Sequence, residues 1–522
     1  MTSDAIVAPS LTAQFRKTAK EFAQNVVIRF AGRTLTFGEF DAQSDRVAAG
    51  LTQRGIAPGE RVALYCTNSD FFALAYVGII KAGATVVPLN LMLNPREVEY
   101  ILNDCQVWGL VYHAAMQEAV AAFRLQVPTL SLAVCVGGQA SNVADVSWAQ
   151  LLENDGHTAK VAVNPAEDVA AIIYTSGTTG KPKGAMLTHR NLLANTASVK
   201  QALQVQSGED VMLVVLPMFH AFAATVGMLT PLLHGGGFVP VPKFEPDLVL
   251  NAIVEGGATI FLGVPSMYNV LMSANDAQVA KFSSIRYCVS GGAAMPQALM
   301  RRFEDRFGKA IYEGDGPTEC SPVTCVNPIG GLRKPASVGL PLPQVEMAIF
   351  DSNGHPVPNN QLNEICVRGP NVMKGYWNRA EETRESFFGD WFRTGDLGYR
   401  DDDGYFFMVD RIKDMVIVNG MNVYPRVIEE VLYQHPAVKE AAVVGEPNEL
   451  HGEIPVAFVV LQAASEVSGA ELRKFCAEHV GRHEVPRKVF FLDALPKNAA
   501  GKVLKRELRK HGELERGVDT RR

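Results

Sequence analysis

The spacing of apolar residues alternates between a helical and an extended period through the first 300 residues. Apolar positions in 37–53 recur at helical spacing, while the short apolar run 62–66 is typical of a buried strand. Residues 71–81 follow the helical period again. The alternation continues with a helix at 95–103 and with strands at 85–88, 109–112, 169–174, 211–216, 259–262 and 287–290. This rhythm predicts an α/β fold, in which mostly parallel strands are covered by helices.

After about residue 335 the predicted strands become short and are bounded by turn residues. They lie at 346–350, 364–368 and 404–409, and Asn353-Gly354 and Asp403-Gly404 are typical hairpin turns. A new pattern begins after Arg411, with helices at 425–434 and 469–479 and strands at 441–445, 455–461 and 488–492. We predict a large N-terminal domain over 1–410 that contains a β-rich subdomain at 335–410. A small mobile α+β C-terminal domain follows over 414–522, with the hinge at 411–413.

Length and charge narrow the class of protein. A chain of 522 residues is too long for one core, because cores stop growing near about 250–300 residues. The net charge of −6 gives no basic footprint for binding nucleic acid. The longest apolar run, 211–216, is far shorter than the roughly 20 residues of a membrane span, and no signal peptide precedes it. We expect a cytoplasmic protein whose eight cysteines are reduced thiols, since none forms a CxxC pair.

One short segment carries the clearest chemical signal. Residues 174–184 read YTSGTTGKPKG and follow the predicted strand 169–174 directly. Glycines let backbone N–H groups approach an anion closely, and hydroxyl and ammonium groups donate to phosphate oxygens. The segment is not the P-loop GxxxxGK[ST], because Pro182 after Lys181 would break the helix which that motif opens. It predicts a phosphate-binding loop, and composition alone leaves a surface turn of small polar residues as the alternative.

This segment resembles the phosphate-loop signature of the adenylate-forming (ANL) superfamily. That superfamily includes acyl-CoA synthetases, luciferases and the adenylation domains of peptide synthetases. Five more segments resemble its signatures in the same order: 290–294 (SGGAA), 316–319 (GPTE), 391–396 (WFRTGD), 411–413 with 419–420 (RIK and NG), and 496–502 (PKNAAGK). The resemblance therefore covers nearly the whole chain, and six matches in order are far more specific than any one of them.

The resemblance implies a site for ATP. Its phosphate-binding residues are Thr175, Ser176, Gly177, Thr178, Thr179, Gly180 and Lys183. Its other nucleotide-binding residues are Gly291, Gly292, Ala293, Asp315, Gly316, Asp396 and Arg411. Thr318 donates to a phosphate oxygen, and Glu319 holds Mg²⁺, which prefers hard oxygen ligands. Lys502 bridges the carboxylate and the α-phosphate while negative charge builds there, and Lys413 is the hinge.

Several of these residues also have plain local interpretations. Thr318 suits the start of a helix, Asp396 suits a turn in Thr-Gly-Asp, and a lysine such as Lys502 is usually solvated. His220 in the segment PMFHAF suits a packed histidine, whereas the resemblance puts it beside the acyl pocket with a role in shape rather than proton transfer. The predicted acyl-pocket residues are Phe222, Met267 and Gly292.

One position departs from the family pattern. The family usually has an aromatic residue, most often tyrosine, directly before the glycine of the GxTE segment. Asp315 occupies that place here. An aspartate cannot stack on adenine as an aromatic ring does, although it can accept a hydrogen bond from the adenine amino group. The departure affects how the site would bind the adenine ring, and it leaves the predicted phosphate-binding residues unchanged.

The resemblance implies two half-reactions that use ATP, Mg²⁺ and coenzyme A. A carboxylate attacks the α-phosphate to give an acyl-adenylate and pyrophosphate, and a thiol, coenzyme A, then attacks the adenylate carbonyl. Enzymes that activate α-amino acids have an aspartate after the phenylalanine of this pocket segment, where Phe219 is here followed by His220. A neutral imidazole is a poor partner for an ammonium group, so an amino-acid substrate is disfavoured.

The predicted pocket segments, 219–226, 262–268 and 290–294, contain mainly apolar or small residues. They favour a medium- or long-chain fatty acid, with an aryl or alicyclic carboxylate as the alternative. A ligase that loads acyl groups onto a carrier protein would keep every ATP motif, so it also stays open. A non-catalytic ATP-binding protein is the third alternative. The sequence leaves open whether the chain forms a homodimer.

Overall fold

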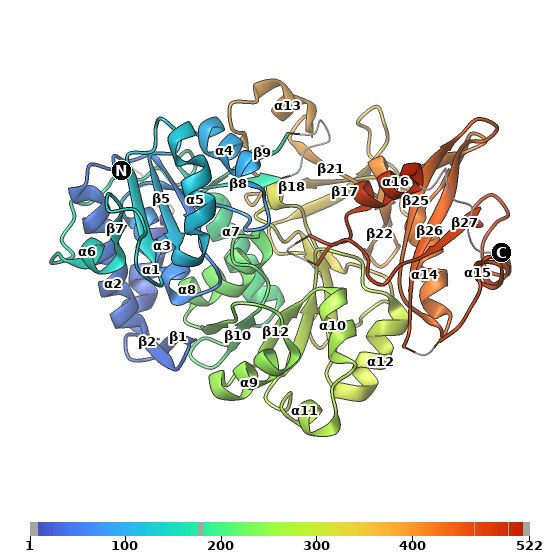
Figure 1. Cartoon of the computed structure of the whole chain (residues 1–522), viewed down its shortest axis with the longest axis horizontal. Coiled ribbons are helices and arrows are strands. Elements are labelled where there is room, and N and C mark those ends of the chain that lie inside the picture. The colour runs from blue at the N-terminus through green and yellow to red at the C-terminus, as the bar shows by residue number, and fades with distance from the viewer. Residues whose placement is uncertain (1–8, 176–180, 464, 499–500, 515–522) are drawn as a thin grey trace, which may run out of the picture.

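Two large sheets form the body of the molecule, and two smaller sheets lie towards the C-terminus (Figure 1). The computed structural model describes residues 9–175, 181–463, 465–498 and 501–514. Helices alternate with parallel strands through the body, which confirms the predicted α/β class.

The first large sheet has eight strands in the order β19-β9-β8-β4-β3-β5-β6-β7. Its strands from β8 to β7 pair in parallel, while β9 and β19 pair antiparallel at the other edge. The strands are β3 (Arg61–Tyr65), β4 (Thr85–Pro88), β5 (Gly109–His113), β6 (Leu132–Val136), β7 (Val146–Ser147), β8 (Val169–Thr175), β9 (Lys183–Thr188) and β19 (Gly375–Tyr376). The predicted phosphate loop joins β8 to β9 at the antiparallel edge.

The second large sheet has nine strands in the order β16-β15-β14-β13-β12-β10-β11-β1-β2. Its strands are β1 (Val26–Phe30), β2 (Arg33–Thr36), β10 (Val211–Val214), β11 (Gly237–Pro240), β12 (Ile260–Gly263), β13 (Tyr287–Ser290), β14 (Ile311–Asp315), β15 (Cys325–Val326) and β16 (Leu340–Pro341). The six strands from β14 to β1 pair in parallel, so their carboxyl ends meet at one edge of the sheet.

Helices cover both sheets, and their apolar faces pack into a continuous core with the strands. They are α1 (Leu11–Glu21), α2 (Phe37–Gln53), α3 (Asp70–Lys81), α4 (Pro95–Asp104), α5 (Gln117–Phe123), α6 (Trp148–Leu152), α7 (His189–Ala202), α8 (Thr230–His234), α9 (Pro246–Gly256), α10 (Pro265–Leu271), α11 (Asp276–Ala280) and α12 (Gln297–Phe307). The π-helix Ala223–Leu229 precedes α8, and no periodicity in the sequence had indicated it.

The predicted β-rich region forms an antiparallel sheet of five strands. They are β17 (Glu346–Phe350), β18 (Asn363–Arg368), β20 (Phe387–Phe388), β21 (Trp391–Arg400) and β22 (Phe406–Arg411), with α13 (Ala380–Glu385) before β20. The hairpin between β21 and β22 turns at Gly404, whose φ of +88° suits glycine.

A fourth sheet is built entirely from the last part of the chain. Its strands are β23 (Val416–Val418), β24 (Met421–Val423), β25 (Val438–Asn448), β26 (Gly452–Leu461) and β27 (Lys488–Phe491), and its helices are α14 (Pro425–Gln434), α15 (Gly469–Ala477) and α16 (Lys505–Leu514). The chain passes from β22 of the third sheet to β23 of the fourth through the single 3-10 turn Ile412–Asp414.

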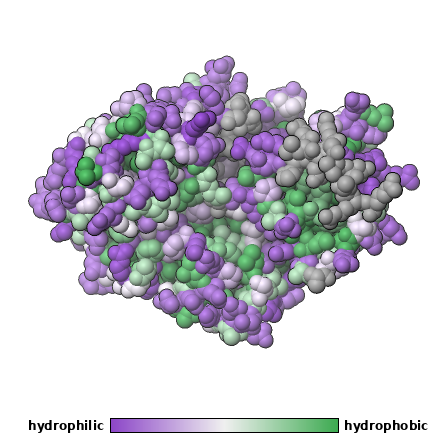
Figure 2. All heavy atoms as spheres, viewed as in Figure 1, coloured by the Kyte–Doolittle hydropathy of each residue, from purple (hydrophilic) through white to green (hydrophobic). Residues whose placement is uncertain are grey.

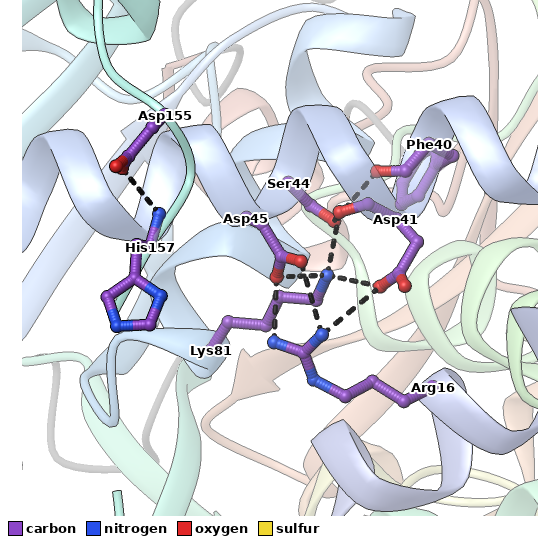
Figure 3. Close-up of polar contacts among 8 residues, drawn as sticks. All are labelled: Arg16, Phe40, Asp41, Ser44, Asp45, Lys81, Asp155 and His157. Atoms are coloured by element: carbon purple, nitrogen blue, oxygen red, sulfur yellow. Dashed lines mark hydrogen bonds and ion pairs between the residues drawn. The ribbon is translucent and has the colours of Figure 1, made fainter. Parts of the chain in front are cut away.

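A buried ion-pair network ties α1, α2 and α3 together (Figure 3). The Lys81 side chain is 1% exposed and pairs with Asp41 and Asp45, whose Oδ1 lies 2.8 Å from Lys81 Nζ. Arg16 binds both carboxylate oxygens of Asp45 from the solvent side. Burial lowers the pKa of Lys81, while both carboxylates act in the opposite direction. Removing the lysine would leave two carboxylates facing each other.

The face seen in Figure 2 is mostly hydrophilic at its rim, with hydrophobic side chains gathered towards the middle. Within the described residues, no helix is both long enough and apolar enough to span a bilayer. All eight cysteines are buried and unpaired by disulfides, as the sequence predicted.

Candidate active site

The candidate site lies where the parallel strands β13 and β14 end. Ser290 stands opposite Glu313 in their register, so the loops that follow leave the sheet side by side. The first loop contains residues 291–293, and the second begins with Asp315 and Gly316. Two groups of predicted nucleotide-binding residues, which are separated by about twenty positions in the sequence, are therefore neighbours.

Two hydroxyl groups hold the carboxylate of Glu319 in the 3-10 turn Thr318–Cys320. Thr175 Oγ1 lies 3.2 Å and the Tyr376 hydroxyl 2.9 Å from Glu319 Oε1, and both donate to it. Thr175 is the last residue of β8, directly before the segment 176–180. The contact therefore joins the phosphate loop to the predicted Mg²⁺ ligand.

Two lysines follow the predicted loop, and each lies over an aromatic ring. Lys183 Nζ is 5.3 Å from the ring centre of Tyr376, and Lys181 Nζ is 5.6 Å from that of Tyr100. Such cation–π contacts restrain a flexible lysine without neutralising its charge. The other predicted phosphate ligands, Ser176, Gly177, Thr178, Thr179 and Gly180, lie outside the described residues.

Asp396 on β21 and Arg411 on β22 are register partners. Arg411 Nε lies 3.2 Å from Asp396 Oδ1, but the two groups are not aligned for a hydrogen bond. Asp396 is 5% exposed, and its Oδ1 accepts no hydrogen bond within the described part of the chain. A buried carboxylate oxygen that accepts no hydrogen bond lowers the stability of the fold unless a ligand donates to it, and a ribose hydroxyl is a suitable donor.

Asp315 belongs to the same group of charges. Burial and the neighbouring carboxylate of Asp396 raise the pKa of Asp315 to about 6, against the opposing effect of Arg411 and Lys502. Two carboxylates and two cations therefore meet at the end of β14. At neutral pH they leave the site close to electrically balanced before a polyanion binds.

Lys502 reaches this group from the C-terminal part of the chain. Its backbone N–H donates to Asn498 Oδ1 at 2.9 Å. Gly501, directly before it, has a φ of +77°, and a Cβ there would lie 2.7 Å from Ser266 Oγ, so glycine lets the chain pack closely on α10 at this point. Burial and the positive charge of Arg411 lower the pKa of Lys502 to about 8.

His220 lies between Lys502 and an apolar cavity. Its Nδ1 accepts a hydrogen bond from the Phe222 backbone N–H at 3.3 Å, which assigns the proton to Nε2. Burial and the charge of Lys502 lower the pKa of His220 to about 4. The imidazole is therefore neutral at physiological pH, which agrees with a role in shape.

The cavity has an empty volume of about 560 Å³, counting its open mouth. Most of its lining is aliphatic or glycine, and its polar side chains are His220, Ser290, Asp315 and Thr318. The apolar lining consists of Val199, Leu203, Phe222, Val226, Val289, Pro322, Val323, Val326 and Leu342. Ser290 Oγ is buried and has no partner within the described residues, so a polar group of a ligand can bind there.

Two of the three predicted acyl-pocket residues, Phe222 and Gly292, line this cavity. Met267 lies on α10 and is not among the described lining residues. The sequence interpretation missed Val199 and Leu203, which line the cavity from the region of α7. Both look like ordinary buried positions of a covering helix, so no local signal separates them from the rest of the core.

The donor set at Glu319 suits magnesium that arrives with a nucleotide. Within the described residues, no group of three or more His, Cys, Asp or Glu side chains converges as a metal site. Mg²⁺ is usually held by one or two carboxylates together with waters and substrate phosphates. A single ordered carboxylate beside the phosphate loop fits that pattern.

Comparison with known families agrees with this geometry. Residues 15–377 match the AMP-binding enzyme family, and residues 427–502 match the AMP-binding enzyme C-terminal domain. The long-chain-fatty-acid–CoA ligase of Bacillus subtilis (strain 168) is 35% identical over 517 residues, covering 94% of this chain and 92% of that protein. A feruloyl-CoA synthase of Amycolatopsis sp is 37% identical over 484 residues, covering 92% and 95% of the two chains.

Solved structures extend the likeness to the whole fold. The anthranilate CoA ligase AuaEII in complex with anthranoyl-AMP matches with a TM-score of 0.92 and 28% identity, over 99% of this chain and 100% of that one. MatB from Rhodopseudomonas palustris matches with a TM-score of 0.89 in its ATP-bound structure and 0.78 in its apo structure. Identity is 31% and coverage is 96% of this chain and 99% of MatB in both comparisons, so the two MatB structures differ in arrangement rather than in sequence.

Proposed function

The chain belongs to the AMP-binding enzyme family, and on that premise we propose that it is an AMP-forming acid–CoA ligase. It activates a carboxylic acid with ATP and transfers the acyl group to coenzyme A. The proposal is carried by Lys502, a half-buried cation whose charge acts on Asp315 and His220, and both of these residues line the apolar cavity. A cation held at that point stabilises charge that develops between an acid in the cavity and a bound nucleotide.

In the first half-reaction a carboxylate oxygen attacks the α-phosphorus of ATP. A bond between that oxygen and phosphorus forms, the bond to the β-phosphate breaks, and pyrophosphate leaves. Lys502 stabilises the charge on the carboxylate and phosphate oxygens, Thr318 donates to a phosphate oxygen, and Asp396 accepts from a ribose hydroxyl. Mg²⁺ bound to ATP neutralises phosphate charge, and Glu319 would hold it.

In the second half-reaction the thiol of coenzyme A attacks the acyl carbonyl. The thioester bond forms, AMP leaves, and the thiol proton passes to solvent. The C-terminal domain turns about Lys413 between the two steps and withdraws Lys502. Two observations support this hinge: only the 3-10 turn Ile412–Asp414 links the third sheet to the fourth, and the two MatB structures fit this chain to different degrees.

A medium- or long-chain fatty acid is the proposed substrate. The cavity lining is dominated by valine and leucine side chains, which bind a hydrocarbon chain without directional contacts. Among the described residues, its polar side chains besides Ser290 are His220, Asp315 and Thr318, which belong to the proposed nucleotide and catalytic site. The relative from Bacillus subtilis is named for the same substrate class.

An aryl carboxylate is the second candidate, and one observation favours it. The unpartnered hydroxyl of Ser290 lines the cavity and can pair with a polar substituent, which a saturated chain lacks. Relatives named for ferulate and anthranilate belong to this class.

A panel of carboxylates tests the proposal. The chain is incubated with ATP, Mg²⁺, coenzyme A and one acid at a time, and AMP and thioester are measured. We expect AMP with acids of about 8–18 carbons, with a weaker response to cinnamate-like acids and none to amino acids. Replacing coenzyme A by a phosphopantetheinylated carrier protein separates the carrier-loading alternative. If no acid yields pyrophosphate or AMP, the chain is a non-catalytic nucleotide-binding protein and the proposal fails.

The domain limits at 410 and 414 and the location in the cytoplasm stay predictions, and the oligomeric state stays open. Each can be tested on the purified chain or in cells, by limited proteolysis, by fractionation and by light scattering.

A further inference from the structure

A cluster of polar contacts on α4 meets both ends of the predicted phosphate loop. The carboxylate of Asp104, the last residue of α4, accepts from the Tyr174 hydroxyl through Oδ2 at 2.7 Å. Its other oxygen, Oδ1, accepts from Arg379 Nη2 at 2.7 Å. The Asp104 side chain is 11% exposed, so both bonds form in a largely dehydrated setting. In Figure 1, α4 lies beside β8 and β9. The segment after β19 also contacts the end of α4, through Trp377 and the Asp104 carbonyl.

The same cluster contacts the chain after the loop. Tyr100 stands one helical turn before Asp104 on α4, and its hydroxyl donates to the Pro182 carbonyl at 3.4 Å. Arg379 Nη2 donates to the Tyr100 hydroxyl at 3.1 Å as well as to Asp104. Tyr174 precedes the segment 176–180 and Pro182 follows it, so one face of α4 binds the chain on both sides of the loop.

The cluster also connects the two residues that flank the loop to Glu319. Trp377 donates from its backbone N–H to the Gly184 carbonyl at 2.8 Å and from its indole N–H to the Asp104 carbonyl at 3.1 Å. The preceding residue, Tyr376, donates to Glu319. One short stretch, 376–379, therefore joins the predicted Mg²⁺ ligand to the anchor of the phosphate loop.

We propose that Asp104, Tyr174 and Arg379 are positioning residues that set the phosphate loop relative to Glu319. This inference rests on the proposed function and adds three residues that contact neither substrate nor metal. A loop that must present several donors to a polyphosphate loses binding free energy when its ends can shift, because the donors must then be ordered on binding. The anchor, which consists of Asp104, Tyr174 and Arg379, fixes the ends of the loop before ATP binds and so reduces this cost in binding free energy.

The fold contains a second triad of the same composition that serves as a matched control. The Tyr112 hydroxyl donates to Asp145 Oδ2 at 2.6 Å, and Arg124 pairs with the other oxygen of Asp145. Tyr112 lies on β5 and Asp145 directly precedes β7 of the same eight-stranded sheet, and no hydrogen bond or ion pair joins this triad to Tyr174 or Pro182 within the described residues. We expect a substitution in this second triad to lower stability about as much as one in the Asp104 cluster, without changing the binding of ATP.

The experiment compares Asp104→Asn with Asp145→Asn in the full-length chain. For Asp104→Asn we expect the KM for ATP, and the KM for pyrophosphate in the reverse reaction, to rise about tenfold, the effect of one weakened hydrogen bond to a charged group. Thioester formation from supplied acyl-adenylate should change less than about twofold, since it needs no pyrophosphate contact. Asp145→Asn should lower the midpoint of thermal unfolding about as much as Asp104→Asn does. It should leave the KM values for ATP and for pyrophosphate unchanged.

Equal KM values in the two variants, or equal losses in both half-reactions, would overturn the inference. If Asp104→Asn does not fold, Tyr174→Phe removes one hydroxyl from the same anchor and must raise the KM for ATP while Tyr112→Phe does not. If the unaltered chain forms no AMP with any acid, the proposed function fails. The anchor is then tested by calorimetry of ATP binding, in which Asp104→Asn must raise the Kd for ATP more than Asp145→Asn does.

Discussion

The guanidinium of Arg426 on α14 lies 4.0 Å from the carboxylate of Glu313 on β14, measured from Nη2 to Oε1. The pair joins the C-terminal sheet and its helices to the strand that ends in Asp315. Glu313 is 2% exposed, and its Oε2 has no partner within the described residues. Burial raises the pKa of Glu313 to about 7, and Arg426 acts in the opposite direction. The attraction between α14 and β14 therefore depends on the charge on Glu313.

Glu313→Gln keeps the shape of the side chain and removes this attraction. We expect adenylation to slow by about fivefold, which corresponds to about 1 kcal/mol. Thioester formation from supplied acyl-adenylate should stay the same or rise, since it needs the other arrangement of the domain. Asn269→Ala is the control, because Asn269 donates to the Lys439 carbonyl across the same interface without any charge. A parallel loss in both half-reactions would contradict the coupling.

Lys502 should give adenylation its alkaline limb. The pKa of Lys502 is lowered to about 8, and only the protonated amine stabilises the developing charge. The kcat/KM for adenylation should therefore fall as pH rises through about 8. Lys502→Arg should remove the limb, because arginine stays charged throughout this range. Pyrophosphate release measured across pH 6–10 tests this.

Lys502→Ala should lower adenylation by at least about a hundredfold and leave thioester formation from supplied acyl-adenylate intact. No further limb is expected between pH 5 and 8 from His220, whose pKa is lowered to about 4. An equal loss of both half-reactions in the alanine variant would reject the role given to Lys502.

Asp396→Asn should raise the KM for ATP by about tenfold, because a charged acceptor becomes a neutral one in a buried place. The same comparison with 2′-deoxy-ATP and 3′-deoxy-ATP identifies the partner. With the analogue that lacks the contacted hydroxyl, the substitution should cause little further loss. Fully additive losses with both analogues would show that Asp396 Oδ1 does not bind the ribose.

Lys81→Met should destabilise the N-terminal body by about 1.5–3 kcal/mol, since Asp41 and Asp45 lose their buried cation and keep only Arg16 on the solvent side. Arg16→Met removes a partner that is 45% exposed and should cost no more than about 1 kcal/mol. The free energy of unfolding in urea measures both. Similar values for the two variants would show that the buried lysine is no more important than its surface neighbour.

Val199→Phe should shift substrate preference towards shorter acids, because the larger ring fills part of the cavity that Val199 lines. The KM for the longest accepted acid should rise by at least about tenfold, while that for a short acid changes little. Leu192→Phe is the matched control on the same helix, since Leu192 is buried but is not among the described lining residues. An unchanged chain-length profile in Val199→Phe would place the acyl chain elsewhere.

The sequence determined the elements and the chemical groups of this protein. It predicted α2 and α14 with the bounds that the structure has, because their signals are local. Thr36 and Glu39 form a capping box at the start of α2, and Pro425 begins α14. The loop motif and the acidic and basic residues of the predicted site could likewise be named from the sequence, since each lies in a contiguous segment, and their roles stay predictions. The strand predicted at 211–216 was too long, because only 211–214 pair with neighbouring strands.

Only the tertiary structure decided how these groups meet. Val199 and Leu203 became cavity residues because the fold brings the end of α7 to the same cavity as residues of β13 and β14, and nothing within a few residues of them encodes that arrangement. The pair of Glu313 with Arg426, and the anchor of Asp104 with Arg379, join positions more than a hundred residues apart. Backbone propensities act over a few neighbours, whereas distances between charges and the shape of a cavity depend on the packing of whole sheets and helices.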